Sequence, residues 1–134
     1  MPKSLVATAV ALCIFSAPAE AQLFDRTVPV GRTTEVFIYK PFSRRSCTPA
    51  LAIATLSVKP QHGRVSHFYR QAEMPRRSRF TGRQTGCGGR SVRGFVVTYT
   101  PAPGFYGTDS FIIDVDFKEV GRHAVDVFRI HVIP

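Results

Sequence analysis

The 134-residue sequence contains no tryptophan, two methionines and three cysteines, and it has half as many acidic as basic residues. It contains no Gly-x-Ser-x-Gly elbow, no His-Glu-x-x-His pair and no phosphate-binding loop, so the local motifs of three large enzyme classes are missing. Beyond residue 21 there is no apolar run of the roughly 20 residues that a membrane-spanning helix needs. No stretch there keeps an apolar period of 3.6 residues either. These gaps argue against an enzyme, a membrane anchor and a helical domain.

The first 21 residues are typical of a secretory signal peptide. Lys3 carries a positive charge, residues 5–15 form an apolar run, and Ala19 and Ala21 form an Ala-x-Ala cleavage site. The run is too short for an anchor. We therefore expect a bacterial protein that is exported to the periplasm or secreted, with residues 22–134 forming one domain.

Removal of the signal would leave two cysteines, Cys47 and Cys87, in an oxidising compartment where thiols normally pair. A disulfide that closes a loop of about 40 residues stabilises a fold by ~4 kcal/mol in the chain-entropy model. We therefore predict a structural disulfide between Cys47 and Cys87 rather than a catalytic or metal-bound thiol.

Short runs of β-branched and aromatic residues alternate with glycine and proline after residue 21, which is typical of an all-β domain. The expected strands cover residues 28–30, 34–40, 51–59, 64–69, 95–100, 111–118 and 124–133. Six or seven antiparallel strands in a chain of this length favour an Ig-like β-sandwich, because one sheet can bury a face against another. An open barrel is the alternative.

The clearest strand is 111–118, where apolar and mostly charged residues alternate. It should pair with residues 124–133 across a turn at 119–123. In the last strand the valines before position 128 share one face, whereas the apolar residues from Phe128 onward share the other. We predict a one-residue bulge between Val127 and Phe128 that would restore a continuous core face.

One segment carries a more specific pattern. Residues 97–111 read Val-Thr-Tyr-Thr-Pro-Ala-Pro-Gly-Phe-Tyr-Gly-Thr-Asp-Ser-Phe, and residues 59–65 contain a Pro-x-His-Gly turn. Together with the alternating last strand, these residues resemble the signature of bacterial Ig-like, cadherin-like repeats of the kind found in tandem in adhesins, here as a single divergent copy. The resemblance covers residues 51–69 and 94–134.

The resemblance implies a β-sandwich with an adhesive or architectural role rather than catalysis. Many members of that family carry an acidic calcium-binding stretch near the start of the repeat. This chain has Ser-Arg-Arg-Ser at residues 43–46, which is positively charged. The resemblance therefore does not extend to that calcium site.

Positive charge is concentrated in one part of the sequence. Residues 64–93 contain eight arginines and one glutamate, a net charge of +7, and residues from about 70 to 93 fit an inserted, Arg-rich loop. The disulfide would bring this loop beside two further arginines. The predicted anion-binding residues are Arg44, Arg45, Arg64, Arg70, Arg76, Arg77, Arg79, Arg83, Arg90 and Arg93.

The planar guanidinium group suits phosphate, sulfate and carboxylate. We therefore expect a noncatalytic binding or scaffold module that contacts anionic polysaccharide, lipid head groups or an acidic protein surface through this loop. The alternative is that these charges only keep the loop solvated and bind no partner. A second functional hypothesis is a structural subunit or chaperone-like protein that pairs with a partner through an exposed edge strand.

Specific nucleic-acid recognition is not expected, because the sequence has no reading helix or paired aromatic motif. No cofactor or metal is expected. Two metal hypotheses stay open. One is a zinc site if distant histidines converge, and the other is a calcium site at Asp114 and Asp116, which share a strand face, with Asp109 and Glu119 nearby. Their residues are His62, His67, His123 and His131 for zinc, and Asp109, Asp114, Asp116 and Glu119 for calcium.

Overall fold

A computed structural model describes residues 20–134 of the chain. Its strands are β1 (Glu20–Pro29), β2 (Thr34–Tyr39), β3 (Phe42–Ser43), β4 (Thr48–Pro49), β5 (Ala52–Val58), β6 (Gly63–Glu73), β7 (Ser91–Pro101), β8 (Gly107–Phe117) and β9 (Arg122–Ile133), and the 3-10 turn η1 (Lys118–Val120) joins β8 to β9. Residues 1–19 of the predicted signal peptide lie outside the described residues, and its last two residues, Glu20 and Ala21, begin β1. Within residues 20–134, no helix is long and apolar enough to span a membrane.

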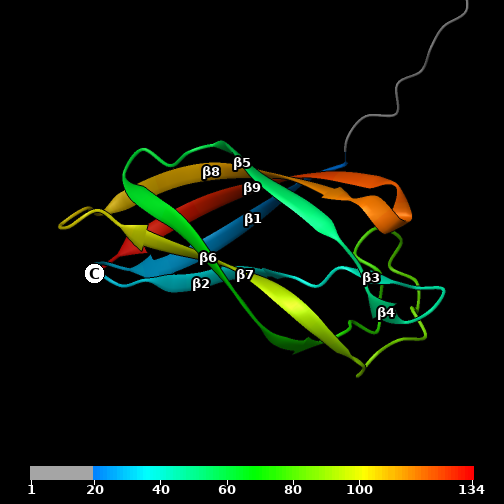
Figure 1. Cartoon of the computed structure of the whole chain (residues 1–134). Coiled ribbons are helices and arrows are strands. Elements are labelled where there is room, and N and C mark those ends of the chain that lie inside the picture. Colours follow the sequence, from blue (N-terminus) through cyan, green and yellow to red (C-terminus); the bar gives the residue numbers. More distant parts are fainter. Residues whose placement is uncertain (1–19) are drawn as a thin grey trace, which may run out of the picture.

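Seven of the strands form two packed layers, as Figure 1 shows. One sheet has the strand order β1-β9-β8-β5 and the other has the order β2-β7-β6, while β3 and β4 form a short pair at one end of the molecule. The predicted all-β, Ig-like sandwich is therefore confirmed. Its pairs are antiparallel apart from β1 and β9, which run in parallel.

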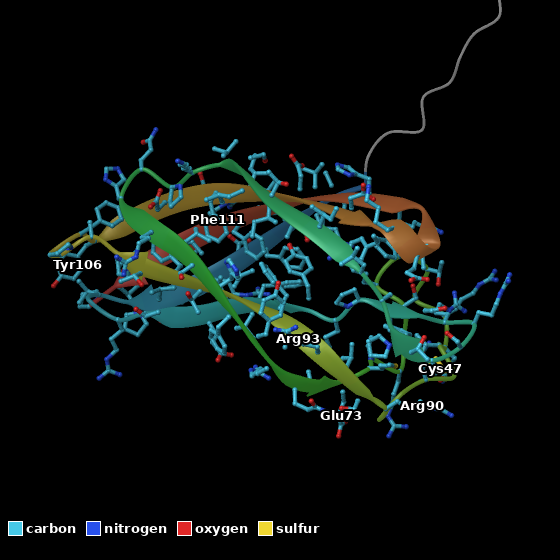
Figure 2. The ribbon with its side chains drawn as sticks, viewed as in Figure 1. Cys47, Glu73, Arg90, Arg93, Tyr106 and Phe111 are labelled. Atoms are coloured by element: carbon cyan, nitrogen blue, oxygen red, sulfur yellow. A yellow bond between two sulfur atoms is a disulfide. The ribbon has the colours of Figure 1, made fainter. Side chains whose placement is uncertain are left out.

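Aromatic and branched side chains fill the space between the layers. Phe111 of β8 and Phe128 of β9 are fully buried, and their rings stack with centroids 4.7 Å apart. Figure 2 shows Phe111 between the sheets. Phe24 of β1 and Phe37 of β2 meet with ring centroids 4.7 Å apart, so the two sheets also touch through this pair. Such rings bury a large apolar area, which makes them the main packing contribution to this core.

Strand β1 is longer than the three residues predicted for it. Its half-buried face carries both polar and apolar side chains, namely Gln22, Phe24, Arg26 and Val28. The sequence therefore lacks the pattern of one apolar and one polar face by which a strand is recognised. Arg26 donates a hydrogen bond from Nε to the carbonyl oxygen of Val36 on β2 at 2.7 Å. This bond links the edge strands of the two sheets.

The predicted hairpin of β8 and β9 is confirmed, but the bulge predicted between Val127 and Phe128 is wrong. The register is continuous from Gly107 opposite Val132 to Phe117 opposite Arg122. The core face of β9 carries an acidic residue among its apolar ones, and its members are Ala124, Asp126, Phe128, Ile130 and Val132. Because a buried aspartate interrupts the apolar series, the sequence only mimics a change of face.

The predicted inserted loop is shorter than expected. Strands β6 and β7 pair continuously as far as Glu73 opposite Ser91. Most of β6 is exposed on both faces, and an exposed strand has no need for the alternating pattern that would reveal it. The connecting segment is therefore residues 74–90, which we call the arginine loop.

A polar cluster closes the end of the sandwich opposite the arginine loop. The carboxylate of Asp109 accepts hydrogen bonds from the Tyr99 hydroxyl at 2.7 Å and from the amides of Gln61 and His62 at 3.0 and 2.9 Å. It also accepts one from the amide of Ser110. These bonds anchor the β5–β6 turn to the start of β8, a structural role.

Candidate anion-binding site

The predicted disulfide between Cys47 and Cys87 is confirmed, with the two Cα atoms 5.3 Å apart. It ties the arginine loop to the segment between β3 and β4. Cys87 is buried with Met74 and Val92 in a small apolar cluster beside the main core, and Phe42 packs against this cluster. The loop is therefore held by a covalent bond and by a packed base.

The arginine loop is folded into a hairpin-like turn by its own hydrogen bonds. The amide of Ser78 donates to the carbonyl of Arg83 at 2.8 Å, and the amide of Gly82 donates to the carbonyl of Ser78 at 2.9 Å. Gly82 adopts a φ of 68°, which favours glycine at this turn. The hydroxyl of Thr85 donates to the carbonyl of Pro75 at 2.7 Å. The loop thus presents its charged side chains from an ordered backbone.

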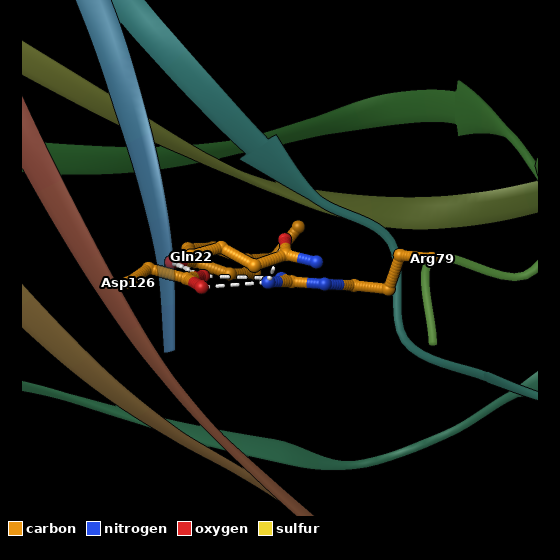
Figure 3. A network of polar contacts seen from close by, with 4 residues as sticks. Gln22, Arg79 and Asp126 are labelled. Carbon is orange, nitrogen blue, oxygen red and sulfur yellow. Dashed lines mark hydrogen bonds and ion pairs between the residues drawn. The ribbon is translucent and has the colours of Figure 1, made fainter. Parts of the chain in front are cut away.

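Arg79 points from this loop into the end of the sandwich, as Figure 3 shows. Its Nη2 donates to Oδ1 of Asp126 at 2.6 Å and its Nη1 donates to Oδ2 at 3.1 Å. Nη2 also donates to Oε1 of Gln22 at 2.9 Å, and the Tyr39 hydroxyl donates to Oδ2 of Asp126 at 2.6 Å. Asp126 is fully buried, so its charge is balanced by a cation from a loop 47 positions away.

Aromatic rings surround the guanidinium of Arg79. The rings of Phe80, Phe37 and Phe117 lie 5.4, 5.8 and 5.8 Å from its central carbon. Cation–π attraction strengthens when the cation is desolvated. Burial, followed by the hydrogen bond to Asp126, raises the pKa of Tyr39 far above its usual range, so this hydroxyl stays a donor. Arg79 therefore serves the fold, and its terminal nitrogens already have partners.

Six of the other nine predicted arginines lie close to the disulfide in the chain, and three lie elsewhere. Arg44, Arg45, Arg76, Arg77, Arg83 and Arg90 lie on the arginine loop or on the segment that the disulfide ties to it. Figure 2 places Cys47 and Arg90 at the opposite end of the molecule from Tyr106.

Three predicted arginines lie away from that loop. Arg70 is on β6 and pairs with Glu35 at 2.9 Å, and Arg93 is on β7 with its guanidinium 4.1 Å from the ring centroid of Tyr69. Arg64 is at the far end of the sandwich, beside the β5–β6 turn. The ten predicted residues therefore do not form one patch.

The arginine loop, β2 and the β8–β9 turn line a pocket of about 460 Å³. Its lining is mainly apolar, with cations around it and no carboxylate among the lining residues. The cations are Lys40, Arg44, Arg77, Arg79 and Arg122.

Sequence reasoning missed Lys40 and Arg122 as site residues. Lys40 follows β2 and Arg122 begins β9, so each lies far from the arginine-rich segment in sequence. Only the register of the sheets brings them to the arginine loop. No local motif could have identified either residue.

The structure does not support either of the two metal hypotheses. Asp109 faces the core, whereas Asp114 and Asp116 lie on the other face of β8. His62 stacks on Phe105 at one end of the molecule and His123 lies 4.0 Å from Asp114. Within residues 20–134, no group of three or more histidine, cysteine, aspartate or glutamate side chains could hold a metal ion.

Comparison with models of known protein families and with curated proteins finds no match to the chain. The chemistry of the site is therefore the evidence for its function. An ordered cationic loop over an apolar pocket can bind and orient an anion by charge and by apolar contact.

Proposed function

We propose that this protein is an exported, noncatalytic binding module that contacts anionic cell-envelope or extracellular material through the arginine loop. It acts in the periplasm or outside a bacterial cell. The proposal includes its relationship to bacterial Ig-like, cadherin-like repeats, based on the turn pattern at residues 97–111. The disulfide between Cys47 and Cys87 supports export, because such bonds persist in oxidising compartments.

The observation that carries the proposal is the charge around the pocket beside the arginine loop. Five cationic side chains line this pocket and no carboxylate does. Arg79 is neutralised by Asp126, which leaves Lys40, Arg44, Arg77 and Arg122 for a ligand. Like charges held together raise the local potential and attract anions. A binding role is favoured over catalysis because the sequence contains no recognised catalytic spacing.

The proposal is tested with heparin, a soluble sulfated polysaccharide without an apolar tail. The loop variant is Arg76→Gln/Arg77→Gln/Arg83→Gln. The matched control, Arg32→Gln/Lys59→Gln/Arg64→Gln, removes the same charge from exposed residues outside the arginine loop. Binding is measured by isothermal titration calorimetry at low and high salt.

We expect the loop variant to lose about tenfold or more in affinity for heparin, since charged hydrogen bonds are worth more than neutral ones, while the control loses much less. Affinity should also fall as salt increases, because salt screens exposed charges. Equal losses in both variants would mean that net charge alone causes the effect, which would contradict the proposal. Binding that does not change with salt would also contradict it.

A free sheet edge favours a second candidate function, pairing with another protein. β6 pairs with β7 on one side, and no other described strand pairs with it. Its residues 66–71 are all exposed, and they include Phe68 and Tyr69. Unpaired amides and carbonyls on such an edge can accept a strand from a partner.

This second function predicts a stoichiometric protein partner that survives high salt during purification from the cell envelope. The Phe68→Lys variant, which places a charge on the edge strand, should lose this partner and keep heparin binding. The heparin-defective loop variant should keep the partner. Retention that depends on the arginine loop alone would exclude the edge as the binding surface.

A further inference from the structure

The pocket beside the arginine loop combines an apolar interior with a cationic border. Its apolar lining comes from four separate parts of the chain, namely β2, residues 41–42 at the start of β3, the arginine loop and the end of the β8–β9 hairpin. The main apolar side chains are Phe37, Ile38, Phe42, Phe80, Phe117 and Val120. The interior therefore suits a hydrocarbon rather than a sugar, whose hydroxyls would need polar partners.

The border of the pocket determines the charge that its occupant carries. Lys40, Arg77 and Arg122 line the pocket, and the guanidinium of Arg122 lies 5.3 Å from the centroid of the Phe80 ring. A cationic or zwitterionic head group would find no carboxylate among the lining residues. Arg77 and Arg122 are exposed and Lys40 is half-buried, so an anionic head group would find charged donors on the solvent side of the lining. The apolar space beside them screens charge interactions less than water does.

The size of the pocket limits the occupant as well. At about 460 Å³, the pocket lies in the range that holds a small ligand. An extended chain fits a pocket of this volume. Arg79 is one of the lining residues, and its ion pair with Asp126 holds it in place.

We propose that this pocket binds a single-chain anionic amphiphile of the fatty-acid type, with the acyl chain among the aromatic side chains and the carboxylate at Lys40, Arg77 and Arg122. This inference rests on the proposed function, since it names the ligand class that the cationic loop recognises. It makes the protein a carrier or sensor of acyl anions rather than a binder of polymers alone.

The first test compares ligands that differ in one part. Decanoate and hexanoate share a head group and differ in tail length, whereas decanoate and decyltrimethylammonium share a tail and differ in charge. Each methylene that leaves water adds roughly a factor of four in affinity, so decanoate should bind on the order of 100-fold more tightly than hexanoate. The cationic analogue should bind at least about tenfold more weakly than decanoate.

The second test uses matched variants. Val120→Glu places a carboxylate at the pocket lining, and Val58→Glu makes the same change on β5, outside the pocket; the two valines are similarly exposed, at 42% and 47%. Lys40→Gln/Arg122→Gln removes two charges from the border. Its control, Arg32→Gln/Lys59→Gln, removes two charges from exposed residues that lie outside the arginine loop and do not line the pocket.

We expect Val120→Glu and Lys40→Gln/Arg122→Gln to lose about tenfold or more in decanoate affinity, and both controls to keep it. Calorimetry below the micelle concentration measures the affinity, and circular dichroism and thermal unfolding verify the fold of each variant. Similar affinities for decanoate and hexanoate would overturn the inference. So would equal losses in variants and controls.

Three further outcomes compare this inference with the proposed function. Heparin binding that depends on the arginine loop, together with no dependence on tail length, would overturn the amphiphile and leave the proposed function standing. Loss of both would overturn both. A dimer that Val120→Glu dissociates, without decanoate binding, would assign the pocket to a second copy of the chain and overturn the amphiphile.

Discussion

The fully buried carboxylate of Asp126 on β9 receives both terminal nitrogens of Arg79, at 2.6 and 3.1 Å. The two residues join the arginine loop to the core of the sandwich. The side chain of Arg79 is itself mostly shielded, with 24% of its surface exposed. The pair therefore determines both the position of the loop and the integrity of the core.

The first prediction concerns this pair. Arg79→Met should reduce the free energy of unfolding by about 3 kcal/mol or more, because it leaves a buried charge without its cation. Arg79→Met/Asp126→Leu should cost less than the single change, since it removes both charges. Urea unfolding measures both variants. A double variant at least as unstable as the single one would mean that burial of an unpaired charge is not the cause.

The second prediction concerns the disulfide. Cys47→Ala/Cys87→Ala should lower the free energy of unfolding by about 4 kcal/mol, as expected for a closed loop of 40 residues. The variant should also lose affinity for heparin, because the arginine loop loses its tether. Reduction of the unaltered protein should reproduce both effects, and an unchanged unfolding midpoint after full reduction would contradict the prediction.

The third prediction is a pH dependence of stability. Burial by itself raises the pKa of Asp109, but the hydrogen bonds from Tyr99 and three backbone amides outweigh it, so this pKa lies below its ordinary value. A depressed pKa in the folded state stabilises the protein above the unfolded pKa, about 3.9. That stabilisation is lost as the pH falls through the folded pKa.

Asp109→Asn isolates this contribution. The unaltered protein should be more stable than the variant at pH 7, and the difference should shrink as the pH is lowered below about 4. Urea unfolding at a series of pH values measures the difference. A gap that stays constant down to pH 2 would show that ionisation of Asp109 does not contribute.

The fourth prediction concerns a close approach at the far end of the sandwich. A Cβ at Gly63 would lie 2.4 Å from two atoms of the fully buried Tyr99 side chain. Gly63→Ala should therefore destabilise the fold by roughly 1–3 kcal/mol through overpacking. Gly31→Ala is the control, because nothing lies within 4 Å of its Cβ, although its φ of 68° carries some strain. Thermal unfolding should show the larger loss at Gly63.

Much of the fold could be predicted because a strand with one buried face alternates between apolar and polar residues, whereas an exposed strand need not. β8 alternates between buried and half-buried residues, and this alternation is visible in the sequence. β6 is exposed on both faces over much of its length, so only its first half was predicted. The false bulge in β9 has one cause, which is that Asp126 occupies an apolar position.

The site was less predictable than the fold for a related reason. Composition identified the arginine-rich segment, but it could not tell that Arg79 turns inward, since its partner Asp126 is 47 positions away. Lys40 and Arg122 reach the pocket only through the arrangement of the sheets. The disulfide was predictable because only two cysteines follow the expected signal peptide.

The parallel pairing of β1 with β9 has a mechanical consequence. Glu20 lies opposite Ala124 and Pro29 lies opposite Ile133, so the start of β1 and the end of β9 are at opposite ends of one ladder. Tension applied between them would slide the two strands past each other and load their backbone hydrogen bonds together. A domain pulled from these two points would therefore resist stretching better than one whose terminal strands peel apart bond by bond.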